Sequence, residues 1–132
     1  MSLALPLHRI ALTHRVAPLA LRAPLVAAVD DIRTALGTTL PNGAGVVVLA
    51  TCNRFEVQGW GDASLPERTR ALVELVQPDV VSRLEVHEGR RALTEMIRVA
   101  AGLDSLVRGE REIVGQMRRA WLRARQHHWT VG

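Results

Sequence analysis

Apolar and polar residues are distributed along the chain with two periods, one typical of strands and one typical of helices. Four apolar residues, Val46 to Leu49, follow one another without interruption, which predicts a fully buried strand because three of them are β-branched. Three further segments predict strands, at residues 7–13, 55–60 and 80–87. Apolar residues at helical spacing predict four helices, at about 24–36, 66–77, 88–101 and 110–127.

The last two predicted helices each have two distinct sides. In the helix over 88–101, the expected inward stripe is Leu93, Met96, Ile97 and Ala100. The helix over 110–127 carries apolar residues on one side and four arginines on the other, Arg118, Arg119, Arg123 and Arg125. The arginine side is either a solvated surface or a track for phosphate groups, and the pattern alone favours the solvated surface.

The predicted order is β-α-β-β-α-β followed by two helices. This order matches a ferredoxin-like split βαβ core of the α+β class, with additional C-terminal helices. The sequence has no internal repeat and no linker, so residues 1–132 are predicted to form a single domain. The chain ends soon after the last predicted helix, which we interpret as a fragment or a truncated relative.

Composition narrows the class of protein. The 132 residues are 48% hydrophobic, which is ordinary for a globular domain and argues against disorder. No apolar run approaches the roughly 20 residues of a membrane span, and the first residues lack the pattern of a signal peptide. A single cysteine cannot form an internal disulfide, so a reducing, cytoplasmic setting is predicted.

The basic side chains other than histidine are all arginine, and the formal net charge is +4. Arginine binds phosphate and carboxylate through two parallel hydrogen bonds, although this choice equally fits a bias in genomic composition. The positive charge permits a nucleic-acid partner. The absence of tyrosine and the single phenylalanine disfavour a surface on which bases stack.

Polar residues of four kinds follow the central predicted strand directly, as Thr51-Cys52-Asn53-Arg54. A lone cysteine after an apolar strand is most often a small buried hydrophobe. Here Arg54 and Arg15 could lower the pKa of the thiol below its ordinary value of about 8.5, and polar Thr51 and Asn53 indicate an exposed edge. Cys52 is therefore either a structural residue or a nucleophile.

Other kinds of site are not indicated. The five histidines show no zinc-ligand spacing with the one cysteine, so no metal is predicted. The sequence has no GxGxxG and no P-loop, so no nucleotide cofactor site is expected in this chain. Glu110 stands at the start of a predicted helix, where its negative charge would interact favourably with the helix dipole. This interaction alone would explain a carboxylate there.

Three segments of the chain resemble the N-terminal catalytic domain of the glutamyl-tRNA reductases. They are Thr13-His14-Arg15-Val16-Ala17-Pro18 with the residues to Arg22, the TCNR core within 46–56, and the run GLDSLVRGE at 102–110 with its flanks from 98 to 116. The order and separation of these segments fit the family, and the similarity covers nearly the whole chain. The resemblance also implies the ferredoxin-like fold.

The resemblance implies a reaction and a role for each matching residue. Cys52 would attack the aminoacyl ester of glutamyl-tRNA to give a thioester, which NADPH would reduce to glutamate-1-semialdehyde in tetrapyrrole (haem) biosynthesis. Arg54 would bind the glutamyl carboxylate and Glu110 would support the pocket. The residues that would position the substrate are Thr51, Asn53, Ser105 and Gln116.

This chain also departs from the family pattern. Glu95 stands where the family has a histidine in the catalytic pocket, and a carboxylate there would repel a thiolate. Val16, Ala23 and Arg111 replace the family's threonine, acidic residue and proline. The family's NADPH domain and dimerisation helix do not match any part of this chain, so alone it is expected to form the thioester or to hydrolyse the ester. The partners implied are glutamyl-tRNA and the next enzyme of the pathway.

Two alternatives remain open at this point. Glu95 and the missing domains suggest a non-catalytic family member that binds tRNA or another haem-pathway protein. The other alternative is an unrelated small domain in which Cys52 is a buried structural residue.

Overall fold

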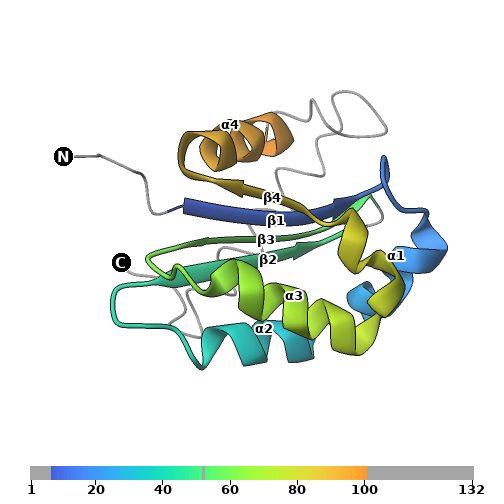
Figure 1. The fold of residues 1–132 in the computed structure, drawn as a ribbon, viewed down its shortest axis with the longest axis horizontal. Coiled ribbons are helices and arrows are strands. Elements are labelled where there is room, and N and C mark those ends of the chain that lie inside the picture. Colours follow the sequence, from blue (N-terminus) through green and yellow to red (C-terminus); the bar gives the residue numbers. More distant parts are fainter. Residues whose placement is uncertain (1–6, 52, 101–132) are drawn as a thin grey trace.

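A four-stranded antiparallel sheet organises the part of the chain that this computed structural model describes, residues 7–51 and 53–100 (Figure 1). The strands lie in the order β2-β3-β1-β4. Their bounds are β1 Leu7–Thr13, β2 Gly45–Ala50, β3 Arg54–Trp60 and β4 Glu85–Glu88. The first three confirm the strands predicted at 7–13, 46–49 and 55–60, with the last two slightly longer than expected. Because each pair of neighbours is antiparallel, β1 and β2 run in one direction with β3 between them.

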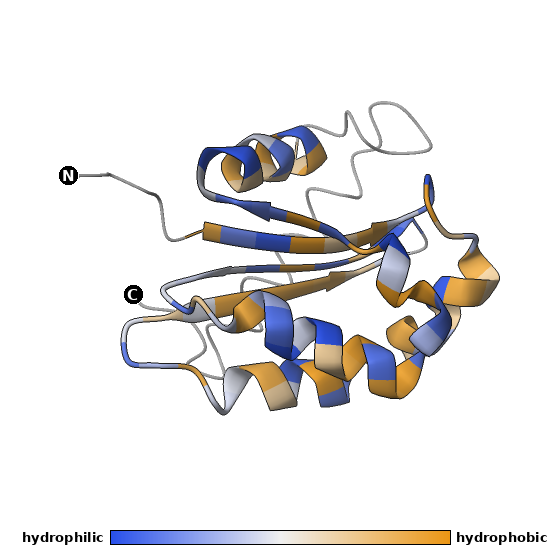
Figure 2. Ribbon diagram, viewed as in Figure 1, coloured by the Kyte–Doolittle hydropathy of each residue, from blue (hydrophilic) through white to orange (hydrophobic). Residues whose placement is uncertain are grey.

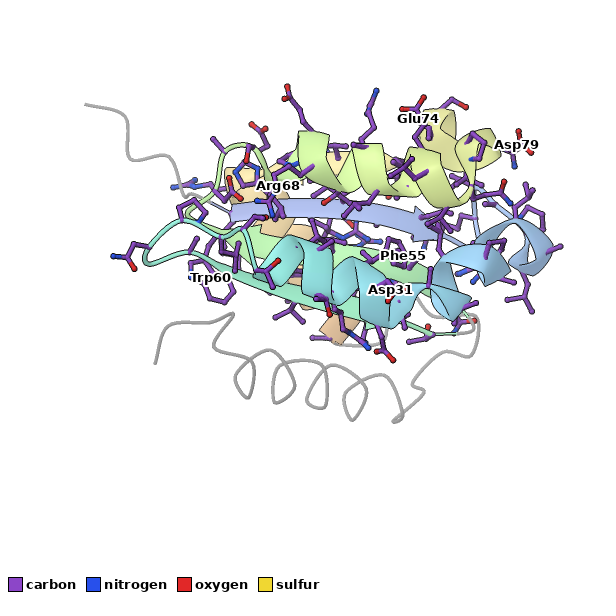
Figure 3. All side chains as sticks on the ribbon, turned by 90° about the horizontal axis from the view of Figure 1, so that it is seen from below. Asp31, Phe55, Trp60, Arg68, Glu74 and Asp79 are labelled. Carbon is purple, nitrogen blue, oxygen red and sulfur yellow. The ribbon has the colours of Figure 1, made fainter. Side chains whose placement is uncertain are left out.

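The two faces of the sheet differ in chemistry because successive side chains of a strand point to opposite faces. On one face, Ile10 pairs with Val57 and Leu12 pairs with Phe55, and all four are fully buried in the hydrophobic core. Figure 3 places Phe55 in this interior, beneath the helices. The opposite face carries the alternate residues of the same strands, and several of them are charged.

Helices cover both faces of the sheet. The helices α2 (Val29–Gly37) and α3 (Leu65–Val76) lie along one face, and α4 (Gly89–Ala100) lies against β1 and β4 on the other (Figure 1). Hydrophobic and hydrophilic residues alternate along α2 and α3, as helices with one buried side require (Figure 2). Arg68 of α3 donates a hydrogen bond of 2.9 Å to the carbonyl of Leu36, which ties α3 to the end of α2 (Figure 3).

The helix predicted over 24–36 is two helices, so that prediction is wrong in its start and its continuity. The first, α1 (Leu19–Ala27), begins after Pro18 and contains Pro24 in its interior. The expectation placed the wrong proline at the start: Pro18 already has the extended backbone of a residue that precedes a helix. Ala28 ends α1 and begins α2, with φ of −94° and ψ of 9°.

The strand predicted over 80–87 is also wrong for its first half. A 3-10 helix, η1 (Pro78–Arg83), occupies this region, and β4 begins only at Glu85. Pro78 starts the turn, and the N–H of Leu84 donates to the carbonyl of Val81 at 3.3 Å. Val80 is therefore buried in the core from a helical turn. A single apolar residue in the sequence does not show whether it belongs to a helical turn or to a strand.

The stripe expected to face inward on α4 is wrong for Leu93 and Ile97, whereas Met96 and Ala100 are half-buried. Leu93 and Ile97 are 40% and 59% exposed, whereas Ala92 and Val99 are buried. The reason is the polar chemistry of the sheet face that α4 covers, since Glu95 is among the residues turned toward it, with its side chain only 19% exposed. The helix predicted over 110–127 lies outside the described residues. Within those residues, no helix combines the length and the apolar character needed to cross a membrane.

Two leucines on helices provide a test of this core. Leu36 is fully buried and Leu75 is 82% exposed. We expect Leu36→Ala to lower the free energy of unfolding by about 3 kcal/mol, because it removes buried methyl groups and leaves a cavity. Leu75→Ala is the matched control and should change it by less than about 0.5 kcal/mol. Urea unfolding measures both, and equal losses in the two variants would contradict this core.

Candidate active site

The turn between β2 and β3 brings Thr51 and Asn53 together at the end of the hairpin. The N–H of Thr51 donates to the carbonyl of Arg54 at 2.8 Å, and the N–H of Asn53 donates to Oγ1 of Thr51 at 3.1 Å. Thr51 and Asn53 are only 7% and 6% exposed, so the expectation that they form an exposed edge is wrong. They can be buried because these backbone groups find partners within the turn itself.

The end of β1 lies beside this turn. The N–H of His14 donates to the carbonyl of Asn53 at 2.9 Å, and Thr13 is opposite Arg54 in the sheet. Thr13 is buried, and within the described part of the chain its hydroxyl oxygen has no hydrogen-bond partner, nor does Nδ1 of His14. Buried polar atoms are rarely left in this state.

A carboxylate shared by two arginines lies on the polar face of the sheet, next to the turn. Nη2 of Arg9 and Nη1 of Arg54 lie 2.9 and 3.5 Å from Oε1 of Glu56, and Nε2 of Gln58 donates to Oε2 of Glu56 at 2.7 Å. We call these four residues the polar network. The side chains of Arg9 and Glu56 are 0% exposed and that of Arg54 is 1% exposed. Alternation along β3 places residues 54, 56 and 58 on one face, and the β1–β3 register adds Arg9.

Arg9 also faces acidic residues from β4 and α4. Its Nη1 lies 3.5 Å from Oε2 of Glu85 and donates to Nδ1 of His87 at 3.1 Å. Burial by itself lowers the pKa of Arg9, but the charges of Glu56, Glu85 and Glu95 outweigh this and raise that pKa above its ordinary value. Arg9 therefore stays a cation at every pH at which the protein is folded.

The predicted site residues fall into two groups. The structure brings Thr51, Asn53 and Arg54 together, with Arg15 exposed in the loop that follows β1. The other predicted site residues, Cys52, Ser105, Glu110 and Gln116, lie outside the described residues. Sequence reasoning missed Arg9 and Glu56. The available signal was the presence of charged residues within strands that are otherwise apolar.

No group of three or more histidine, cysteine or acidic residues within 7–51 and 53–100 could hold a metal ion. The fold and the polar network thus define a small α/β domain in which the cationic side chain of Arg54 lies beside a buried strand-end turn. The model of one family, "Glutamyl-tRNAGlu reductase, N-terminal domain", matches residues 10–132. The chain belongs to this family.

Individual relatives agree with the family match. The glutamyl-tRNA reductase of one strain of Thermus thermophilus is 47% identical over 129 residues, which cover 97% of this chain and 31% of that protein. The enzyme of one strain of Xanthomonas campestris pv. campestris is 37% identical over 118 residues, or 88% and 27% of the two chains. The solved structure of glutamyl-tRNA reductase from Methanopyrus kandleri superposes with a TM-score of 0.70 at 27% identity, covering 96% of this chain and 30% of that one. This chain thus spans about a third of the length of these relatives.

The hydroxyl of Thr51 provides a test of the turn. Thr51→Val should lower the free energy of unfolding by about 1–3 kcal/mol, because it leaves the buried N–H of Asn53 without an acceptor. Thr51→Ser keeps the oxygen and is the matched control, with a smaller expected loss. Urea unfolding measures stability, and hydrogen exchange should show loss of protection at the Asn53 amide in the valine variant alone. Unchanged protection there would contradict the role of this hydroxyl.

Proposed function

We propose that this chain is the catalytic domain of a glutamyl-tRNA reductase and that Cys52 is its nucleophile. The observation that carries the proposal is the position of Arg54, which is the last residue of the TCNR segment and belongs to a buried polar network. Membership of the family and the names of the relatives support the same reaction. The proposal keeps a reducing, cytoplasmic setting, because the thiol of Cys52 has to remain reduced.

The first step would be acyl transfer. The thiolate of Cys52 attacks the carbonyl carbon of the glutamyl ester, the ester C–O bond breaks, and the ribose oxygen of the tRNA leaves as a hydroxyl after taking a proton. The product is a thioester on Cys52. Since Oγ1 of Thr51 already accepts a hydrogen bond from Asn53, its own proton can be donated to a substrate oxygen.

Recognition of the glutamyl side chain would depend on Arg54. Its planar guanidinium matches a carboxylate with two parallel hydrogen bonds. The fully buried charges of the polar network are Arg9, Arg54 and Glu56, and Arg9 also faces Glu85 at 3.5 Å. What supports this role of Arg54 is its guanidinium and its place at the strand-end turn.

Several finer statements belong to the same proposal. We infer the ferredoxin-like split βαβ topology, supported by the strand order with β3 inserted between β1 and β2. The thioester would then be reduced to glutamate-1-semialdehyde with hydride from NADPH, and the resemblance assigns NADPH binding to a separate domain. Glutamyl-tRNA would be the substrate. The next enzyme of the pathway and a second copy of the reductase would be further partners.

Trapping the acyl-enzyme tests this function. Incubation with tRNA charged with labelled glutamate should give a covalent adduct on Cys52, detected by peptide mapping, and Cys52→Ser should give no thioester. Arg54→Met should retain the adduct but lose at least about ten-fold in kcat/KM with the glutamyl ester, because a charge-assisted contact is lost. Equal ester cleavage by the parent chain and Cys52→Ser would rule the proposal out.

A second candidate is a non-catalytic member that binds tRNA or another haem-pathway protein. It is favoured by Glu95, which is turned toward the polar network at the position of a family histidine. If this candidate is correct, the parent chain should bind glutamyl-tRNA without cleaving its ester, and Glu95→His should introduce cleavage because an imidazole removes the added negative charge and can transfer protons. Glu74→His, on the exposed side of α3, is the control. Full ester cleavage by the parent chain would exclude this candidate.

A further inference from the structure

We propose that Thr13 is a substrate-binding residue of this site and that its hydroxyl donates a hydrogen bond to the side-chain carboxylate of the glutamyl group. This inference rests on the proposed function, since the bound molecule is the substrate assigned there. It adds a residue of β1, outside the TCNR segment, to the determinants of substrate binding.

The hydroxyl of Thr13 is buried without a partner. The residue is 1% exposed, and within the described part of the chain its Oγ1 makes no hydrogen bond. Taking a hydroxyl out of water without replacing its hydrogen bonds costs free energy, so native proteins keep few such groups. Each one that they keep calls for an explanation, and a functional role is one of those available. The position of Thr13 in the fold decides between the explanations.

Thr13 lies beside the turn that carries the TCNR segment. In the pairing of β1 with β3 it is directly opposite Arg54, and the alternation of strand residues places both side chains on the polar face of the sheet. The Cβ atoms of such opposite residues are about 5 Å apart. The N–H of His14 donates to the carbonyl of Asn53 at 2.9 Å and holds the end of β1 against the turn. A molecule that contacts Arg54 therefore lies within reach of the hydroxyl of Thr13.

The chemistry of the two side chains selects the group that binds there. A guanidinium only donates hydrogen bonds, whereas a hydroxyl can donate or accept. A substrate group that contacts both side chains must therefore accept, and a carboxylate has two oxygens with about four acceptor positions. An ammonium group would meet a cation directly across the strand pair. This choice follows from the donor character of Arg54 and its register position, whatever other partners Arg54 has.

The test measures acylation of Cys52 by glutamyl-tRNA. Thr13→Val removes the hydroxyl and keeps the branched shape, so KM should rise about ten-fold with little change in kcat, because a hydrogen bond to a charged group is lost from the bound substrate and the transition state alike. The same variant should raise the melting temperature of the substrate-free protein by about 2–5 °C, since it removes a buried hydroxyl without a partner. Thr13→Ser keeps the hydroxyl and should retain most of kcat/KM.

Thr69 of α3 is the matched control. It is also fully buried, and its hydroxyl likewise makes no hydrogen bond among the residues that the structure describes. It belongs to a helix on the apolar face of the sheet, away from the polar network. Thr69→Val should therefore raise the melting temperature without changing KM or kcat.

The double variant Thr13→Val/Arg54→Met tests whether the two side chains contact one carboxylate. It should have nearly the same kcat/KM as Arg54→Met, because residues that bind the same group do not act additively. Fully additive losses would overturn the inference. So would an unchanged KM or a lower melting temperature in Thr13→Val, or an equal rise of KM in Thr13→Ser. If the parent chain forms no adduct on Cys52, the proposed function fails instead.

Discussion

The carboxylate of Glu56, shared between two buried arginines, is the interaction on which the rest of the structure depends. Burying three charges is costly unless every one of them is paired and hydrogen-bonded. Here the partners come from two strands, so the pairing holds only in one register of β1 against β3. A shift of one residue would send Arg9 to the apolar face and Ile10 to the polar one, which makes any other register strongly unfavourable.

The same requirement explains how the helices are placed. The apolar face of the sheet is covered by helices whose buried sides are apolar, and the polar face is covered by α4. That helix turns Ala92, Glu95 and Val99 inward and leaves Leu93 and Ile97 exposed. Small residues and a carboxylate suit a layer of charged side chains better than leucine and isoleucine do. The orientation of α4 is therefore set by the charges beneath it and not by its own most hydrophobic stripe.

Local chemistry in the sequence predicted β1, β2, β3 and the place of the turn after β2, but not the burial of that turn or the start of β4. An unbroken run of β-branched residues and four consecutive polar residues are local signals in the sequence. They predicted β2, β3 and the grouping of Thr51, Asn53 and Arg54. The break at Ala28, the 3-10 helix before β4 and the orientation of α4 depend on packing. The pairing of Arg9 with Glu56 joins residues 47 positions apart, and it becomes visible only once the register of the sheet is known.

The charges on the polar face of the sheet also determine how a substitution of a charged residue there would act. The turn between β2 and β3 is built from neighbours in sequence, whereas the charged side chains described on this face come from β1, β3, β4 and α4. Glu85 and Glu95, with side chains 35% and 19% exposed, lie nearer to solvent than Glu56, and water screens their charges more. The charge of Glu95 raises the pKa of Arg9, and it is also offset by Arg91 and Arg98, each 3.8 Å from its carboxylate. The effect of a charged residue on this face therefore depends on the charges that the neighbouring strands and α4 supply, and not on its own position alone.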